Sequence, residues 1–177
     1  MKKIFIIFAL CITAFPLLAQ ESRFKLSLWD EMAWATPNTT RDIAGLDLGI
    51  GSTSDYVKGL QLDLAWGETR YELHGLGFSW GVNKANEVSG AQISSVNMAE
   101  NINGVQFGAI NLSTGAMQGL QVGFFNNAED LRGFQVGIVN HARNIYGVQF
   151  GLINIAENGF LPVMIFVNGR FDSSFNI

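Results

Sequence analysis

A tandem repeat occupies most of the chain and limits how it can fold. The segment GFQVGIVNHARNIYGVQFGLIN, residues 133–154, contains one pattern twice: a glycine, a glutamine two residues later and an asparagine seven residues later. The leading glycines stand at positions 90, 104, 119, 133 and 147, at spacings of 14 or 15 residues, and weaker copies begin at positions 45, 59 and 75. Self-similarity of this kind indicates one small supersecondary unit stacked many times.

Each repeat has the alternation of a β-strand. In the last copy Val148, Phe150 and Leu152 point to one side, whereas Gln149 and Gly151 point to the other. Strict alternation of polar residues with valine, phenylalanine and leucine favours a strand. The density of glycine and asparagine disfavours a helix. We therefore predict an all-β fold.

The first architecture that fits is a β-solenoid with rungs of about 14 residues and a cap at each end. Rungs stack in register at about 4.8 Å, so each residue type lies on copies of itself. Apolar positions are then expected to form a narrow core. Side-chain amides can bond to their copies above and below, and this predicts a structural ladder. Its predicted members are Gln106, Gln121, Gln135, Gln149, Asn97, Asn111, Asn126, Asn140 and Asn154.

The glutamines allow a second interpretation. With glycines beside them, they can form a flat polar strip on the surface, suited to adhesion or to glycan binding. The ladder interpretation instead gives them only the task of holding the register between rungs.

The alternative architecture is an antiparallel outer-membrane β-barrel with one repeat per strand, which would make the protein a small pore or anchor. The alternation and the low charge of the array fit lipid contact. However, the alternating runs span seven or eight residues, fewer than the 9–11 of a spanning strand. In an antiparallel pair, a residue at one position of a repeat also lies opposite a different position of the next repeat. This gives little reason to keep glutamine and asparagine at fixed positions.

The N-terminus has the pattern of an export signal. Lys2 and Lys3 precede an apolar run from Ile4 to Leu18, which is shorter than the roughly 20 residues of a spanning helix, and Ala19 follows at a plausible cleavage site. The predicted organisation is a signal peptide at 1–19, an N-terminal cap strand region at 20–44, a repeat array at 45–159 and a C-terminal cap strand at 160–177. Cys11, the only cysteine, would leave with the signal.

Charge and location limit the partners. The chain has 15 acidic and 11 basic residues, a net charge of −4, and no basic cluster, so we expect no nucleic-acid partner. The signal predicts export to the periplasm, the outer membrane or the cell surface of a bacterium. The outer membrane and surface glycans are therefore the candidate partners, and the sequence identifies no protein partner.

The sequence contains no assembled catalytic or metal-binding group. His141 occupies a variable position of the repeat, and no carboxylate stands beside it at ligand spacing. Glu129 and Asp130 are adjacent in a turn, whereas Glu68 and Glu72 share a face if extended. The glycine-rich segment 45–55 fits neither a calcium repeat nor a phosphate loop. We predict a non-enzymatic protein without catalytic, cofactor-binding or metal-binding residues.

The tandem G-[LVF]-Q-x-G-x-x-N units resemble those of a family of bacterial surface-repeat proteins. The opening FKLSLW (24–29) and the ending NGFLPVMIFVNGRF (158–171) are also similar to that family. The resemblance implies an exported envelope protein and carries over no catalytic or ligand residues. Some members are lipoproteins, and this chain departs from them because it lacks a good lipidation cysteine.

Overall fold

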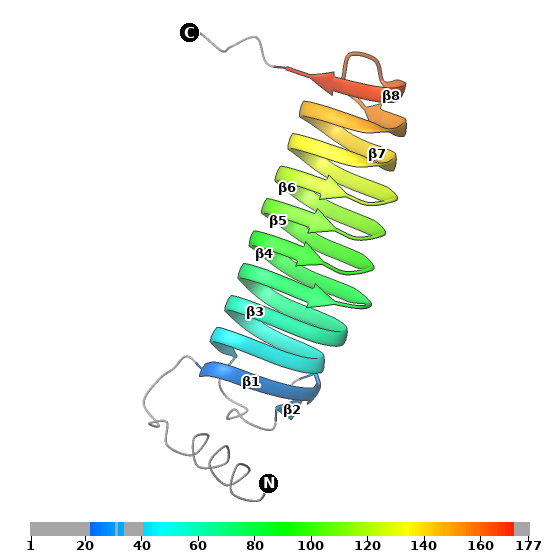
Figure 1. The fold of residues 1–177 in the computed structure, drawn as a ribbon. Coiled ribbons are helices and arrows are strands. Elements are labelled where there is room, and N and C mark those ends of the chain that lie inside the picture. Colours follow the sequence, from blue (N-terminus) through cyan, green and yellow to red (C-terminus); the bar gives the residue numbers. More distant parts are fainter. Residues whose placement is uncertain (1–21, 31, 34–40, 172–177) are drawn as a thin grey trace, which may run out of the picture.

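The chain folds into a rod of stacked β-coils. The computed structural model describes residues 22–30, 32–33 and 41–171. Figure 1 shows the coils following one another along the rod, from β1 near one end to β8 at the other. The predicted signal peptide and Cys11 lie outside the described residues. Within the described part, no helix has the length and apolar character needed to cross a membrane.

All the described elements are strands of one sheet that winds around the rod, in the order β2-β1-β3-β4-β5-β6-β7-β8. Two of them, β3 and β7, continue through more than one coil. The bounds are β1 (Ser22–Trp29), β2 (Met32–Ala33), β3 (Asp42–Ser79), β4 (Val82–Ile93), β5 (Val96–Phe107), β6 (Ile110–Val122), β7 (Phe125–Ala156) and β8 (Val163–Arg170).

Successive coils are parallel and in register, which confirms the solenoid. From β3 through β7 the neighbouring strands pair in parallel with leading glycine on leading glycine, and from β4 onward also with glutamine on glutamine and asparagine on asparagine. At the two ends, β2 pairs antiparallel with β1, and β8 pairs antiparallel with β7. The alternative of an antiparallel barrel is therefore wrong.

The leading glycine of each repeat allows the coils to approach closely. Gly119 has a φ of +131°, in the region that favours glycine, and a Cβ on it would lie 2.0 Å from the carbonyl oxygen of Gly104 in the coil below. Seven further glycines share this positive φ: Gly45, Gly59, Gly75, Gly90, Gly104, Gly133 and Gly147. The repeat period thus follows from a corner that only glycine fits.

The core is narrower and more polar than the alternation predicts. One buried apolar row lies two residues before the glycines: Ile43, Val57, Leu73, Val88, Ile102, Met117, Leu131 and Ile145. A small row lies two residues after the asparagines: Ala85, Ala99, Ser113, Ala128, Ala142 and Ala156. Glutamine and asparagine supply the other two inward rows.

The alternating apolar residues are not part of this core, so the prediction that they form it is wrong. Phe134 is 51% exposed and Phe150 44%, whereas Gln135 and Gln149 beside them are fully buried. In a parallel in-register stack an amide side chain can hydrogen-bond to the same amide in the neighbouring coils, so it can be buried without losing its hydrogen bonds. The opposite face of the strand, with its valines, phenylalanines and leucines, then faces outward.

Candidate functional site

The predicted glutamines form a continuous ladder inside the rod. Each donates from Nε2 to Oε1 of the glutamine in the preceding coil, at 2.7–2.9 Å: Gln106 to Gln92, Gln121 to Gln106, Gln135 to Gln121, and Gln149 to Gln135. Gln121, Gln135 and Gln149 also donate to a backbone carbonyl six residues ahead. All four predicted glutamines are fully buried, so they form no surface strip for a glycan.

The predicted asparagines form a second ladder that donates in the opposite direction. Each step is 2.8 Å from Nδ2 to Oδ1 of the next coil: Asn97 to Asn111, Asn111 to Asn126, Asn126 to Asn140, and Asn140 to Asn154. The second N–H of each donor binds a backbone carbonyl, as in Asn126 to Val136 at 3.0 Å. These nine residues therefore hold the coils together from within.

The surface feature that stands out is an apolar wall along the rod. It is formed by residues at the first, third, fifth and sixth positions after each leading glycine, together with Val82, which pairs with Val96 of the sixth-position row. Its exposed members are Leu60, Leu64, Trp80, Val82, Val105, Phe107, Ile110, Phe124, Phe125, Phe134, Val136, Ile138, Phe150, Leu152 and Ile153. A contiguous exposed apolar surface of this extent marks an interaction site.

The wall turns a corner. β4, β5 and β6 end at Ile93, Phe107 and Val122, and the next strands begin three residues later, after a bend. The residues that project at the bend are among the most exposed of the wall: Trp80 at 69% and Phe124 at 66%. The wall thus covers two adjacent sides of the rod and the convex edge between them.

Charge is segregated from the wall. The wall is carried by seven stretches. Six of them, 75–83, 90–97, 104–111, 119–126, 133–140 and 147–154, contain no acidic, basic or histidine residue, and the seventh, 59–67, contains only Asp63, which is buried. The other charged residues of these coils lie on the remaining part of each turn, as in the ion pairs of Lys84 with Glu68 and Arg143 with Glu129. The rod is therefore amphipathic across its width.

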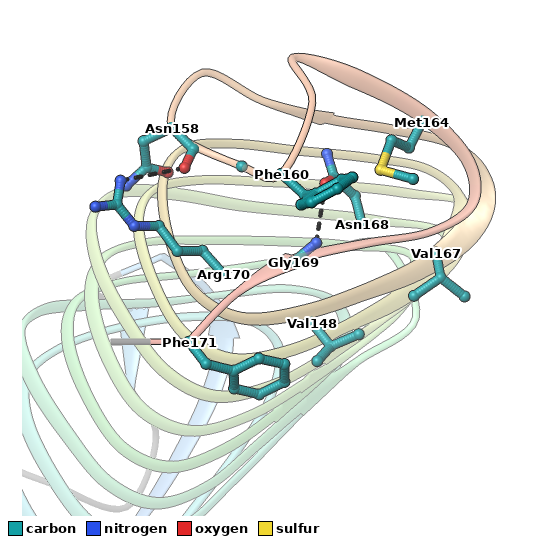
Figure 2. Close-up of a pocket in the computed structure, with 10 residues that line it drawn as sticks. Val148, Asn158, Phe160, Met164, Val167, Asn168, Gly169, Arg170 and Phe171 are labelled. Carbon is teal, nitrogen blue, oxygen red and sulfur yellow. Dashed lines mark hydrogen bonds between the residues drawn. The ribbon is translucent and has the colours of Figure 1, made fainter. Parts of the chain in front are cut away.

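The wall continues into a shallow hollow at the C-terminal end. Val148 of the last coil and Met164 and Val167 of β8 line it, and Figure 2 shows Arg170 and Asn158 at its other side. Arg170 donates to the carbonyl oxygen of Asn158 at 3.3 Å, and Asn168 donates to that of Leu161 at 2.9 Å. Because these polar groups bind the chain itself, the hollow mainly adds apolar surface.

A buried ionic cluster that the sequence did not predict lies in the first coils. Lys25 Nζ lies 3.8 Å from Asp47 Oδ2 and donates to Ser54 Oγ at 2.9 Å. Both Lys25 and Asp47 occupy the glutamine row, because Lys25 pairs with Asp47 two residues after Gly45. An ion pair thus replaces the amides of this row in the first two coils, which lie outside the regular repeats.

Asp63 lies beside this cluster in place of a ladder asparagine. Gly67 occupies the asparagine row of its coil, and a Cβ there would lie 2.5 Å from Asp63 Oδ2. Asp63 is 2% exposed, and neither of its carboxylate oxygens has a hydrogen-bond partner among the described residues. Burial, reinforced by the negative charge of Asp47 and opposed by Lys25, raises the pKa of Asp63 to about 8.

This raised pKa predicts that stability falls as pH rises. Above about pH 4 the unfolded chain loses the Asp63 proton, whereas the folded chain keeps it until about pH 8, so the unfolding free energy decreases across that interval. Asp63→Asn removes the effect. Denaturant unfolding should show the variant gaining on the wild type by on the order of a few kcal/mol between pH 4 and pH 8. A constant difference between the two proteins across this range would contradict the prediction.

The other titratable residues considered in the sequence bind their neighbours on the polar side. His141 Nδ1 lies 2.7 Å from Asn127 Oδ1, and Asp130 accepts from Asn144 at 2.7 Å. Glu68 pairs with Lys84, whereas Glu72 lies 3.7 Å from His74. In the described part of the chain, no group of three or more histidine, cysteine or acidic side chains is placed to hold a metal ion.

Comparison of the chain with protein-family models, with curated proteins and with solved structures found no match. The apolar wall is therefore the candidate site on the strength of its own geometry and chemistry.

Proposed function

We propose that this protein is an exported, non-enzymatic envelope protein of a bacterium and that its apolar wall is its binding surface. The solenoid holds the wall residues at fixed spacing, as a rigid scaffold does for an extended interface. The observation that carries the proposal is the exposure of fifteen large apolar side chains on two sides of the rod that have no exposed charged residue.

Packing inside the rod explains why the repeat keeps its glutamine and asparagine. It does not explain the exposed apolar residues of the wall. The ladders and the two buried rows complete the core without Phe107, Phe134 or Phe150. Leaving such side chains in water is unfavourable by roughly 25 cal/mol for each Å² of apolar surface. Large apolar side chains exposed at the same positions of successive coils are typical of a surface that binds a partner.

Cell fractionation tests the proposal. The wild type should be recovered with the envelope, with Gln20 as its first residue, and Phe107→Glu combined with Ile138→Glu should release a large part of it into the soluble fraction. Asn86→Glu combined with Thr114→Glu adds the same charge at exposed positions on the polar side and should leave the distribution unchanged. Recovery of the uncleaved chain in the cytosol, or equal behaviour of the two double variants, would contradict the proposal.

A further inference from the structure

We infer that the occupant of the apolar wall is a phospholipid surface, along which the rod lies with the wall at the boundary between head groups and acyl chains. This inference rests on the proposed function, because it names what the proposed binding surface binds. The charges beside the wall, the shape of the wall and the hydrogen bonding of its backbone support it.

The charges next to the wall suit a layer of phosphates. One row borders the wall immediately before the leading glycines: Lys58, His74, Ser89, Asn103, Gln118, Arg132 and Tyr146. This row contains two basic residues and no carboxylate. The row on the other border follows the asparagine positions, and its only carboxylate, Glu68, is paired with Lys84 at 2.9 Å.

The remaining surface carboxylates of the repeat coils lie farther from the wall. Glu100, Glu129 and Glu157 each follow a ladder asparagine by three residues, and Glu129 and Glu157 flank Arg143 there. Glu72, Glu87 and Asp130 each precede a leading glycine by three residues, and Glu72 lies 3.7 Å from His74 of the bordering row. Basic groups near the wall and acidic groups away from it are the polarity that favours binding to a membrane surface.

The shape of the wall favours a fluid partner over a second copy of the chain. Each side of the wall is roughly 34 Å long and 13 Å wide, given seven coils at about 4.8 Å and four residues at about 3.3 Å. That is a flat footprint of roughly 400 Å² for each side. One flat contact between two copies would leave the second side and the edge at Phe124 exposed, whereas lipid can cover both sides.

The backbone beneath the wall is already satisfied. The strands that carry the wall pair with the coils before and after them, so their N–H and C=O groups bond within the rod. At the bend, Phe125 N donates to Ala109 O at 3.0 Å and Ile110 N donates to Ser95 O at 3.0 Å. A surface without unpaired backbone groups can enter an apolar medium without the free-energy penalty of removing unpaired N–H and C=O groups from water.

Co-flotation with vesicles tests the inference. The full chain is mixed with phosphatidylcholine vesicles, and the bound fraction is measured after density-gradient centrifugation. The wild type should float, Phe107→Glu combined with Ile138→Glu should lower the partition coefficient at least about tenfold, and Asn86→Glu combined with Thr114→Glu should leave it unchanged. All proteins keep the same N-terminal segment, so its own affinity for lipid does not distinguish them.

Serine at positions 107 and 138 provides a milder version if glutamate disturbs folding, and far-ultraviolet circular dichroism checks the fold of every variant. The lipid inference is overturned if the wild type stays with the soluble fraction, or if the wall variant floats as well as the wild type. If the vesicles fail while the wall variant still leaves the envelope in cells, the wall binds another partner and the proposed function stands. If both assays fail, both proposals fall.

Discussion

Gly119→Ala is expected to destabilise the rod by more than about 4 kcal/mol, because the added Cβ would clash with backbone atoms and not with a side chain that can move away. The added Cβ would lie 2.0 Å from the carbonyl oxygen of Gly104, and the φ of +131° is unfavourable for alanine. Neither group can rotate away, so the coils must separate locally. Denaturant unfolding followed by circular dichroism measures the loss.

The matched control is Gln118→Ala, one residue earlier. Gln118 is exposed, so the change should stay within about 0.5 kcal/mol of the wild type. A Gly119→Ala protein as stable as Gln118→Ala would show that the coils do not stack as closely as the structure has them.

Asn126→Ala is expected to cost on the order of 3 kcal/mol, because it breaks the asparagine ladder in its middle. Asn126 is fully buried, and its Nδ2 serves both Asn140 Oδ1 at 2.8 Å and Val136 O at 3.0 Å. Both acceptors would lose a donor in a place that water does not reach, at about 1–3 kcal/mol for each unsatisfied group. Equilibrium unfolding in denaturant gives the value.

Arg143→Ala removes an exposed side chain with two surface ion pairs and provides the comparison. Because surface pairs contribute little to stability, its loss should be much smaller than that of Asn126→Ala. Asn126→Asp adds a second check: it keeps the shape, removes the donors and should be at least as destabilising as alanine at neutral pH. Equal stability of the Asn126 and Arg143 variants would show that the asparagine ladder does not stabilise the fold.

The sequence predicted the architecture because the repeat carries register information. A glycine, a glutamine and an asparagine kept at one offset are explained by like residues lying on like residues, and the parallel pairing from Gly90 to Gly133 has this arrangement. In an antiparallel fold, the same positions would not have met.

The sequence could not tell which face of the strand lies inside. Alternation at positions 148–152 separates two faces, but period two is the same whichever of them is buried. The usual expectation that apolar residues form the core fails here because ladders satisfy the amides of Gln135 and Asn140 within the stack. The apolar wall, which follows from this reversal, became visible only in the structure.

The ionic cluster was beyond prediction for another reason. Lys25 and Asp63 come from a rung before the first leading glycine and from a degenerate repeat, so no offset connects them in the sequence. Their proximity depends on the stacking of β1 on β3 and on the space left by Gly67.

Hydroxyl-radical footprinting of the wild-type protein in buffer without lipid tests the central claim most directly, namely that the ladder side of each coil faces inward and the phenylalanine side outward. Phe107, Phe134 and Phe150, which are about half exposed, should be modified readily. Met117, Leu131 and Ile145, which are fully buried, should be strongly protected. Protected phenylalanines together with modified Met117 and Leu131 would contradict the account, because the coils would then be turned inside out.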